Sequence, residues 1–381
     1  MYRLRKALYG LRQAPRAWNA KLHSTMLKLG FQNSAEEHAV YVRGSGQSLT
    51  VVGVYVDDLI IVGAQHQVVD KFKAEMKHLF EMSDLGPLSY YLGIQVLQGD
   101  QGITLCQSSY VEKILEKAMM ENCNLCSVPM EPRLKLSKKS ASPPVDATLY
   151  RSLVGSLRYL VHTRPDIAFA VGFVSRFMEA PTTEHMAALK HLLRYLAGTR
   201  SLGCFFGRGE GNMSLVGYSD SDLAGDRDDS KSTSGLIFFL GGSPVSWQSQ
   251  KQKVVALSSC EAEYMAASTA SCHGLWLSRL VADLLNQEIA PPVLLIDNKS
   301  AIAHAKNPGQ FDRCKHIETR YHFLRDCVNN GSLRVDYVGT TDQLADMLTK
   351  ALSRDRLQEL RVRCSVINTQ AGSVGKTDKP A

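Results

Sequence analysis

Two strand-forming runs in the second half of the chain each end in an aspartate. They are Leu215-Val-Gly-Tyr-Ser-Asp220 and Pro292-Val-Leu-Leu-Ile-Asp297, and most residues before each acid are apolar. Acids at the ends of neighbouring strands meet over one edge of a sheet, so a fold can gather carboxylates that are distant in the sequence into one pocket. This placement constrains the fold more than any other feature of the sequence.

The segments around these runs predict a mixed sheet covered by helices. Three strands, a helix, a strand, two helices, a strand and a helix follow one another, an order that indicates an α/β domain over residues 213–352. Glu261 and Glu263 fall in the first turn of the first helix, and Asp346 falls inside the last one. Besides the two runs, the expected strands are 235–240, 244–250 and 333–338, and the expected helices are 260–285, 299–306, 315–329 and 341–352.

The carboxylates of Asp220, Glu263, Asp297 and Asp346 suggest a metal-dependent reaction. Each lies at the end of an apolar strand or in a helix of the same predicted domain. Magnesium takes hard oxygen ligands, and a pair of ions about 3.5 to 4 Å apart needs several shared carboxylates. Such a pair can activate a water and stabilise the leaving oxygen during attack on phosphorus. Any one of these acids alone is better explained as a helix cap or a solvated turn, but the set of four is specific.

A second acidic feature lies far upstream. Residues 48–56 and 59–63 are rich in β-branched residues, and only Asp57 and Asp58 separate them, which predicts a hairpin with the acids at its tip. A helix with an apolar stripe is expected at 65–82. The alternative for an Asp-Asp pair is a simple type I′ turn.

The remaining segments complete the predicted domain organisation. The proline-, lysine- and serine-containing stretch 127–147 is expected to be a linker, and helices are expected between 149 and 196. The last residues have the composition of a disordered tail. The predicted division is therefore a first unit at 1–126, a linker with a helical thumb or connection at 127–211, the α/β domain at 213–352 and a tail at 365–381. The α/β domain is expected to fold when expressed alone.

The charge of the chain suggests a partner that carries phosphates, and its cysteines suggest an intracellular location. The chain has a net charge of +7, and its first 35 residues contain no acid. A basic surface of this kind suits contact with phosphates, although a solvated basic face is the alternative. The nine cysteines and the lack of a signal sequence or a long uncharged apolar span predict an intracellular protein with reduced thiols and no membrane association, without distinguishing cytoplasm from nucleus.

Several motifs resemble the ribonuclease H domain of copia-type retrotransposon polyproteins. The resemblance implies that Asp220, Glu263, Asp297 and Asp346 are the catalytic, metal-binding acids. It further implies cleavage of the RNA strand of RNA-DNA hybrids with two magnesium ions, or with manganese. Glu263 is preferred to Glu261 because it matches the family pattern and the two point to nearly opposite helix faces. The motifs are Tyr218-Ser-Asp-Ser-Asp222, Lys231-Ser-Thr-Ser-Gly235, Ser258-Ser-Cys-Glu-Ala-Glu-Tyr264, Asp297-Asn-Lys-Ser-Ala301, Lys315-His-Ile-Glu318, Arg320-Tyr-His-Phe323 and Gln343-Leu-Ala-Asp-Met-Leu-Thr-Lys350.

The sequence departs from this family in the loop before the last acid. Many ribonucleases H carry a His there, and none occurs between Val338 and Ala345. Copia-type domains usually have Val-Pro-Thr where this chain has Val338-Gly-Thr340, which calls product release and the rigidity of the loop into question. His316 and His322 are expected to be structural.

The upstream part resembles the reverse transcriptase of the same polyproteins. Leu8-Tyr-Gly-Leu-Arg-Gln-Ala-Pro-Arg-Ala-Trp18 is similar to a template- and nucleotide-contacting segment, and Tyr55-Val-Asp-Asp58 to the polymerase active site. The resemblance implies an α+β palm remnant. Asp57 and Asp58 would be its acids, and its nucleic-acid contacts would be Arg12, Gln13, Arg16 and Tyr55.

The polymerase resemblance is incomplete. Polymerases of this family use a further Asp on an earlier strand, and this chain has none before Asp57. We therefore expect a C-terminal fragment of a polyprotein: a truncated, polymerase-inactive reverse transcriptase followed by a ribonuclease H that works with nucleic acid and with other parts of the polyprotein. The alternative is a catalytically dead relic that only binds nucleic acid.

Overall fold

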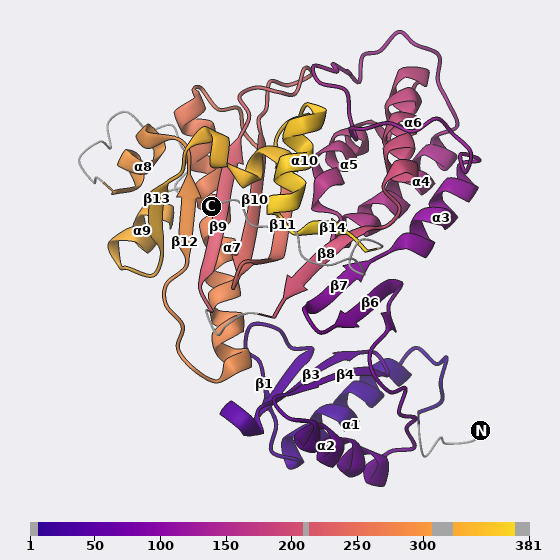
Figure 1. The fold of residues 1–381 in the computed structure, drawn as a ribbon, viewed down its shortest axis with the longest axis vertical. Coiled ribbons are helices and arrows are strands. Elements are labelled where there is room, and N and C mark those ends of the chain that lie inside the picture. Colours follow the sequence, from indigo (N-terminus) through magenta and orange to yellow (C-terminus); the bar gives the residue numbers. More distant parts are fainter. Residues whose placement is uncertain (1–6, 209–212, 307–322, 370–381) are drawn as a thin grey trace. The chain divides into compact units, whose positions relative to one another are not determined.

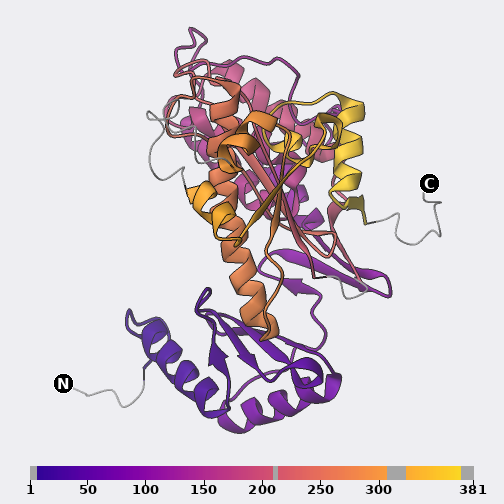
Figure 2. The same ribbon diagram turned by 90° about the vertical axis from the view of Figure 1, so that its left-hand side faces the viewer.

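The computed structural model describes residues 7–208, 213–306 and 323–369, which belong to two compact units (Figure 1). The N-terminal unit consists of residues 1–88 and 276–290, and the main unit consists of residues 89–275 and 291–381. The long helix α7 (Ser259–Leu285) belongs to both, because its last residues, from Trp276 onward, fall in the N-terminal unit (Figure 2).

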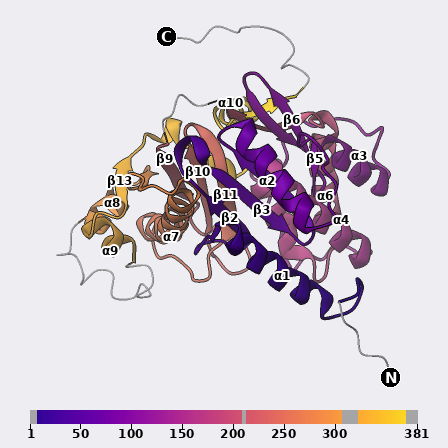
Figure 3. The same ribbon diagram turned by 90° about the horizontal axis from the view of Figure 1, so that it is seen from below.

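The N-terminal unit is a four-stranded antiparallel sheet with two helices on the same face (Figure 3). Its core consists of apolar side chains from both helices and from the sheet, including Leu22, Phe31, Val52, Phe72 and Met76. Phe72 and Met76 belong to the apolar stripe of the predicted helix. The elements are α1 (Ala14–Lys28), β1 (Gln32–Asn33), β2 (Val40–Arg43), the 3-10 turn η1 (Gly46–Ser48), β3 (Thr50–Tyr55), β4 (Asp58–Gly63) and α2 (His66–Leu79).

The main unit contains the predicted mixed sheet, in the order β11-β10-β9-β12-β13. The first three strands are antiparallel neighbours, and β12 runs parallel to both β9 and β13. Helices α7 and α10 lie on opposite faces of this sheet (Figure 1). The α/β prediction is therefore confirmed. The elements are β9 (Leu215–Ser221), β10 (Thr233–Leu240), β11 (Ser243–Lys251), β12 (Val293–Ile296), α8 (Lys299–Lys306), α9 (Phe323–Asn329), β13 (Arg334–Tyr337) and α10 (Arg354–Arg363).

A second sheet of the main unit, β14-β8-β7-β6-β5, does not follow the predicted division. It joins strands from before residue 126, from around residue 205 and from beyond residue 365. The predicted helices between 149 and 196 are present as α4 to α6. The elements are β5 (Tyr90–Tyr91), β6 (Ile94–Gly99), β7 (Gly102–Cys106), α3 (Ser108–Lys117), α4 (Ala147–Leu160), η2 (Val161–Thr163), η3 (Pro165–Ile167), α5 (Ala168–Val174), η4 (Ser175–Phe177), α6 (Thr183–Gly198), β8 (Leu202–Gly207) and β14 (Val366–Asn368).

One hydrophobic core connects these segments. It includes Leu192 of α6, Ile237 and Phe239 of β10, Leu348 of the 3-10 turn η8 (Leu344–Leu348) and Leu360 of α10. The indole of Trp247 in β11 also donates a hydrogen bond of 2.9 Å to the carbonyl of Val161. The expectation that residues 213–352 fold alone is therefore not supported, because a fragment with these bounds would leave one side of its sheet without its packing partners.

Two further expectations need correction. The segment expected as a tail from residue 365 begins with strand β14, whose Val366 is buried and whose backbone pairs with β8, so only residues beyond 369 lie outside the described part. The last predicted helix, 341–352, consists instead of two short 3-10 turns, η7 (Thr340–Asp342) and η8 (Leu344–Leu348). The first half of the predicted helix 315–329 lies outside the described residues, and α9 forms the rest.

Candidate active site

The register of the central strands places Asp220 and Asp297 side by side. Ile296, the last residue of β12, pairs in parallel with Ser219 of β9, so the residues that follow in each strand direction are Asp297 and Asp220. Asp220 is buried, and Asp297 is half-buried. Two runs separated by about seventy residues of sequence thus deliver their acids to one edge of the sheet, as the sequence predicted.

The first turns of α7 bring Glu263 to the same edge. Its Oε1 accepts a hydrogen bond of 3.1 Å from the backbone N–H of Ser221, the residue after Asp220. Glu261 has another role, because its Oε2 accepts a hydrogen bond of 2.9 Å from the N–H of Leu257 at the start of the helix. The N–H of Glu261 in turn donates to Ser258 Oγ at 3.2 Å, an arrangement that resembles a capping box.

Asp346 reaches the site because η8 packs closely on the sheet. Gly235 pairs with Asp220 in the register of β10 and β9. A Cβ atom at Gly235 would lie 2.8 Å from side-chain atoms of Leu348 and Thr349 and 3.1 Å from the carbonyl oxygen of Ala345, so only glycine leaves room for this approach. The side-chain amide of Gln343 donates a hydrogen bond of 2.9 Å to the Ser219 carbonyl and fixes the start of η8 against β9.

The structure groups three of the four predicted acids most tightly. One oxygen from each of Asp220, Glu263 and Asp297 lies within 4.8 Å of the other two, and this is the only such group of potential ligands in the described ranges 7–208, 213–306 and 323–369. Asp346 is buried beside them but faces two cations. Its Oδ1 lies 2.5 Å from Lys350 Nζ, and its Oδ2 lies 3.4 Å from Arg356 Nη2.

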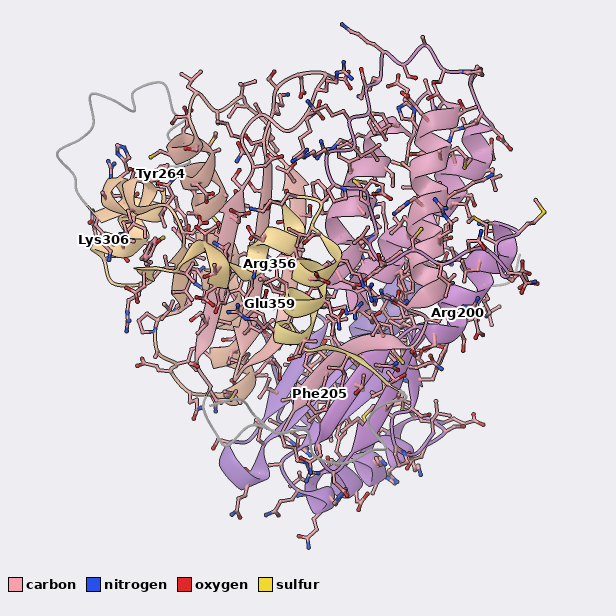
Figure 4. All side chains as sticks on the ribbon, turned by 45° about the horizontal axis from the view of Figure 1, so that its top comes forward. Arg200, Phe205, Tyr264, Lys306, Arg356 and Glu359 are labelled. Carbon is pink, nitrogen blue, oxygen red and sulfur yellow. The ribbon has the colours of Figure 1, made fainter. Side chains whose placement is uncertain are left out.

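Residues to which the sequence analysis assigned no separate role hold these acids in place. Thr349 Oγ1 donates a hydrogen bond to Asp220 Oδ2, and Lys350 Nζ lies 3.9 Å from the same oxygen. Arg356, which is half-buried, also forms an ion pair of 3.0 Å with the exposed Glu359 three residues further along α10 (Figure 4). The four-residue spacing of Asp346 and Lys350 was the available sequence signal, but it indicates an ion pair only where the residues are helical.

Burial and mutual repulsion raise the pKa values of the clustered acids. Burial, with the neighbouring carboxylates of Asp220 and Asp297, raises the pKa of Glu263 to about 10. Burial and the charges of neighbouring acids also raise the pKa values of Asp297 and Asp346. Burial opposes the charge of Lys350, but the surrounding carboxylates outweigh it and raise the pKa of this ammonium group. These carboxylates therefore lack sufficient positive charge around them.

A fifth acid, Asp222, stands near the cluster. Burial raises its pKa to about 6, and the charge of Asp220 adds to this effect. Its carboxylate accepts a hydrogen bond from the N–H of Thr233 in β10. Asp222 was part of a recognised motif, but the sequence did not indicate a separate role for it.

The acidic residues fit divalent cations. Glu263 Oε2 is buried and has no hydrogen-bond partner, although a buried polar atom normally has one. A hard cation bound by oxygen ligands would satisfy this atom and offset the repulsion that raises the pKa of Glu263. Asp220, Glu263 and Asp297 could hold such an ion directly, and Asp346 could join them where Lys350 gives up its contact.

Asp57 and Asp58 have different surroundings. The predicted hairpin is present, but its two-residue turn is Val56-Asp57, and Asp58 is already the first residue of β4, paired with Tyr55; both acids are exposed. Val56 has a φ of 55°, a strained value for a β-branched residue, and its carbonyl accepts a hydrogen bond of 2.7 Å from the indole of Trp18. Within the described residues, no third acid joins Asp57 and Asp58 in a possible metal-binding group.

The other predicted residues divide into described and undescribed ones. Arg12, Gln13 and Arg16 are exposed at the start of α1, and Tyr55 is exposed at the end of β3. His316 and His322 lie outside the described residues. In the loop before Asp346, Gly339 has a φ of −67°, the value that proline would impose, so this loop adopts a proline-like conformation without the proline.

Comparisons with known sequences match both parts of the chain. Residues 1–132 match a family described as reverse transcriptase (RNA-dependent DNA polymerase). A retrovirus-related Pol polyprotein from transposon RE1 of Arabidopsis thaliana is 43% identical over 364 residues, which are 96% of this chain and 25% of that protein. A polyprotein from transposon TNT 1-94 of Nicotiana tabacum is 41% identical over 93% of this chain and 27% of that protein. The chain thus spans about a quarter of the length of these relatives.

A shorter relative and two solved structures extend these comparisons. A putative transposon Ty5-1 protein of Saccharomyces cerevisiae is 34% identical over 70% of this chain and 88% of that protein. A foamy viral protease-reverse transcriptase, solved with an RNA/DNA hybrid, covers 87% of this chain and 39% of its own at 13% identity and a TM-score of 0.48. A ribonuclease H1 of Halobacterium salinarum covers 38% of this chain and 98% of its own, at 14% identity and a TM-score of 0.26. Among the described residues, no helix is long and apolar enough to span a bilayer.

Proposed function

Because this chain belongs to the copia-type retrotransposon Pol polyproteins, with a reverse transcriptase region and a ribonuclease H-like domain, we propose that it cleaves the RNA strand of RNA-DNA hybrids. The observation that carries the proposal is the gathering of Asp220, Glu263 and Asp297 within 4.8 Å of one another from three separate segments. Their mutual repulsion opposes folding, so packing alone does not favour this arrangement.

Magnesium is the proposed cofactor, with manganese as a substitute. Asp220, Glu263, Asp297 and Asp346 are the proposed ligands of two ions, since all four are carboxylates and Glu263 keeps an oxygen without a partner. In hydrolysis at phosphorus, such ions supply an activated water and stabilise the leaving oxygen, which leaves 3′ hydroxyl and 5′ phosphate ends.

The protein itself orients these acids before any substrate arrives. Thr349 fixes one oxygen of Asp220, and the Ser221 N–H fixes one oxygen of Glu263. The side chain of Thr340 hydrogen-bonds to Asp297. Lys350, which is 46% exposed at the mouth of the site, can turn from the carboxylates towards an incoming phosphate. Orientation of this kind lowers the entropy cost of bringing a scissile phosphate into place.

The polymerase-like part is proposed to bind nucleic acid without extending a primer. Arg12, Gln13, Arg16 and Tyr55 expose polar and aromatic groups that can contact a template or primer. Asp57 and Asp58 come from a single turn, whereas polymerisation needs acids from two strands to align the attacking hydroxyl and the triphosphate. Other parts of the polyprotein are the proposed partners that would complete that site.

Cleavage by the full purified chain tests the proposal. The substrates are an end-labelled RNA-DNA hybrid, the same sequence as duplex DNA and the same RNA as a single strand, each with magnesium or with a chelator. We expect magnesium-dependent cuts in the RNA of the hybrid only, and no cuts by an Asp220→Asn control prepared in parallel. Binding of the hybrid without any cleavage would instead support the catalytically dead relic.

A further inference from the structure

An open cavity of about 620 Å³ lies on the surface of the main unit, and none of the clustered acids lines it. Its lining comes from the linker between α3 and α4, from the start of α6 and from the loop between β9 and β10. We call it the linker groove. The lining residues with side chains that bear on its chemistry are Lys135, Ser137, Lys139, Ser140, Glu184 and Arg227.

The linker is held firmly where it forms this groove. The buried imidazole of His185 accepts a hydrogen bond of 3.0 Å from the Thr182 N–H at Nδ1, so its Nε2–H donates to the Ser137 carbonyl at 3.1 Å. Thr182 Oγ1 donates to Ser140 Oγ at 3.4 Å. Leu136, the residue before Ser137, is buried in the core. The sequence predicted a linker here, but the structure gives it fixed contacts with its neighbours.

The linker groove carries excess positive charge. Lys135, Lys139 and Arg227 are exposed, and no ion pair is found for them among the residues that the structure describes. Glu184 is the only acid in the lining. The nearby carboxylate of Asp228 is already occupied, because it accepts hydrogen bonds from Ser137 Oγ and, at 2.8 Å, from the Lys138 N–H.

A chain of polar contacts connects the linker groove with the candidate active site. The Asp228 N–H donates to Asp226 Oδ1 at 2.9 Å, and Asp226 forms an ion pair of 3.1 Å with Arg176. Arg176 also donates to Thr233 Oγ1 at 2.9 Å, and the Thr233 N–H donates to Asp222. The backbone makes the same connection. Arg227 lies in the loop between β9 and β10, and this loop begins two residues after Asp220, at the upper end of the sheet in Figure 1.

We propose that the linker groove binds backbone phosphates of the hybrid beyond the point of cleavage. Lysine, arginine and serine side chains are the groups that contact phosphate without reading sequence. The lining contains no aromatic ring on which a base could stack, which disfavours a single-stranded ligand. The proposal rests on the proposed function, since it assigns part of the same duplex to a second surface of the main unit.

The test is binding of an RNA-DNA hybrid to the full chain without divalent ions, so that no cleavage occurs. The groove variant carries Lys135→Gln, Lys139→Gln and Arg227→Gln. The matched control carries Lys113→Gln, Lys190→Gln and Arg208→Gln, which remove the same charge from exposed positions elsewhere in the main unit. Fluorescence anisotropy at about 50 and about 200 mM salt gives the affinity and its salt dependence.

We expect the groove variant to bind at least about tenfold more weakly at low salt, with a salt slope lower by about one for each lost phosphate contact. The control variant should lose much less. Equal losses of affinity in the two variants, or unchanged binding in both, would overturn the proposal that the linker groove binds the hybrid. If the groove variant shows a lowered melting temperature, the single exchange Lys139→Glu is judged by the same criteria. Magnesium-dependent cleavage by the wild-type chain is scored separately, so failure of the nuclease proposal is distinguishable from failure of the groove.

Discussion

The two acidic sites of this chain differ in how their carboxylates are brought together. Asp57 and Asp58 are neighbours in the sequence, and a single exposed turn is enough to present them. Asp220 in β9, Glu263 in α7 and Asp297 just after β12 come from separate segments, and they meet where two of the three side chains are buried. The first pair lowers the stability of the fold little and depends little on the rest of the fold for its position. The cluster, in contrast, forms only when the surrounding sheet and core are complete.

Because of this difference, the two sites should respond differently to substitution of their acids. Exposed acids are screened by water, and their removal disturbs no packing. Buried acids repel one another without a cation, and burial amplifies that repulsion. The main unit therefore has to stabilise its own active site through its core, and the sharpest tests separate loss of the core from loss of a charge.

The largest effect is expected from removing part of that core. A fragment of residues 213–352 should fail to fold, because Ile237, Phe239 and Leu348 would lose their partners, and each buried side chain contributes about 1.5–3 kcal/mol against a total stability of about 5–15 kcal/mol. A fragment of residues 89–381, which contains the whole main unit, should fold and cleave the hybrid.

Circular dichroism and size-exclusion chromatography of the two fragments decide this prediction. The longer fragment is the control for expression and for the assay. A cooperative thermal transition and hybrid cleavage by residues 213–352 alone would show that the shared core is dispensable, and would restore the boundaries expected from the sequence.

The next largest effect is expected from neutralising one clustered acid. Asp220→Asn or Asp297→Asn should reduce cleavage by more than about a hundredfold, the upper range for groups that only support metal ligands. The melting temperature of the metal-free protein should stay the same or rise, since one repelling charge is removed. Single-turnover cleavage and differential scanning fluorimetry measure the two quantities, and a fall in both would indicate a structural role instead.

The two glutamates at the start of α7 sharpen the same test. Glu263→Gln should be as severe as Asp220→Asn, because Glu263 lies in the cluster. Glu261→Gln should leave cleavage nearly intact and cost about 1 kcal/mol or less of stability, as expected for loss of a helix cap. The opposite ranking of the two variants would contradict the assignment of Glu263.

The sequence predicted this cluster of acids better than it predicted the sheets and the core of the main unit around it. Asp220 and Asp297 were readable because apolar strands end in them, and Glu263 because of its motif. The pairing of β8 with β7 and β14 was not readable, since these short strands are separated by roughly a hundred residues or more and periodicity says nothing about partners. The roles of Lys350 and Thr349, although both stand in a recognised motif, were not predicted for a similar reason, because their contacts depend on how η8 packs against Gly235.

A smaller effect is expected from pH. The pKa of Glu263 is raised to about 10 in the folded, metal-free protein, well above its ordinary value of 4.5. The folded state therefore keeps a proton that the unfolded state releases, so stability falls as pH rises between these two values. One such group gives a slope of at most about 1.4 kcal/mol per pH unit. The raised pKa values of Asp297 and Asp346 act in the same direction.

Urea unfolding in a chelator at about pH 5, 7 and 9 measures this slope. Glu263→Gln should flatten it, because the amide resembles the protonated acid at every pH. The matched variant Glu261→Gln should keep the wild-type slope. A wild-type protein that is equally stable across this range would show that Glu263 is ionised in the metal-free fold, and that a neighbouring cation such as Lys350 already compensates it.

The smallest effect is expected at the exposed pair. Asp57→Ala should leave hybrid cleavage unchanged and should alter the free energy of unfolding by no more than about 0.5 kcal/mol, because the side chain is exposed and the described structure gives it no ion pair.

The wild-type chain itself should not extend a primer on an RNA template with magnesium or manganese, since Asp57 and Asp58 supply only one side of a two-strand metal site and no aspartate precedes them. Binding of the template-primer should persist, because Arg12 and Arg16 need no metal to contact phosphate. Primer extension measured beside a binding titration separates the two properties. Template-dependent extension that disappears in Asp57→Ala would show that one exposed turn can assemble a working polymerase site, and it would remove the contrast between the two acidic sites.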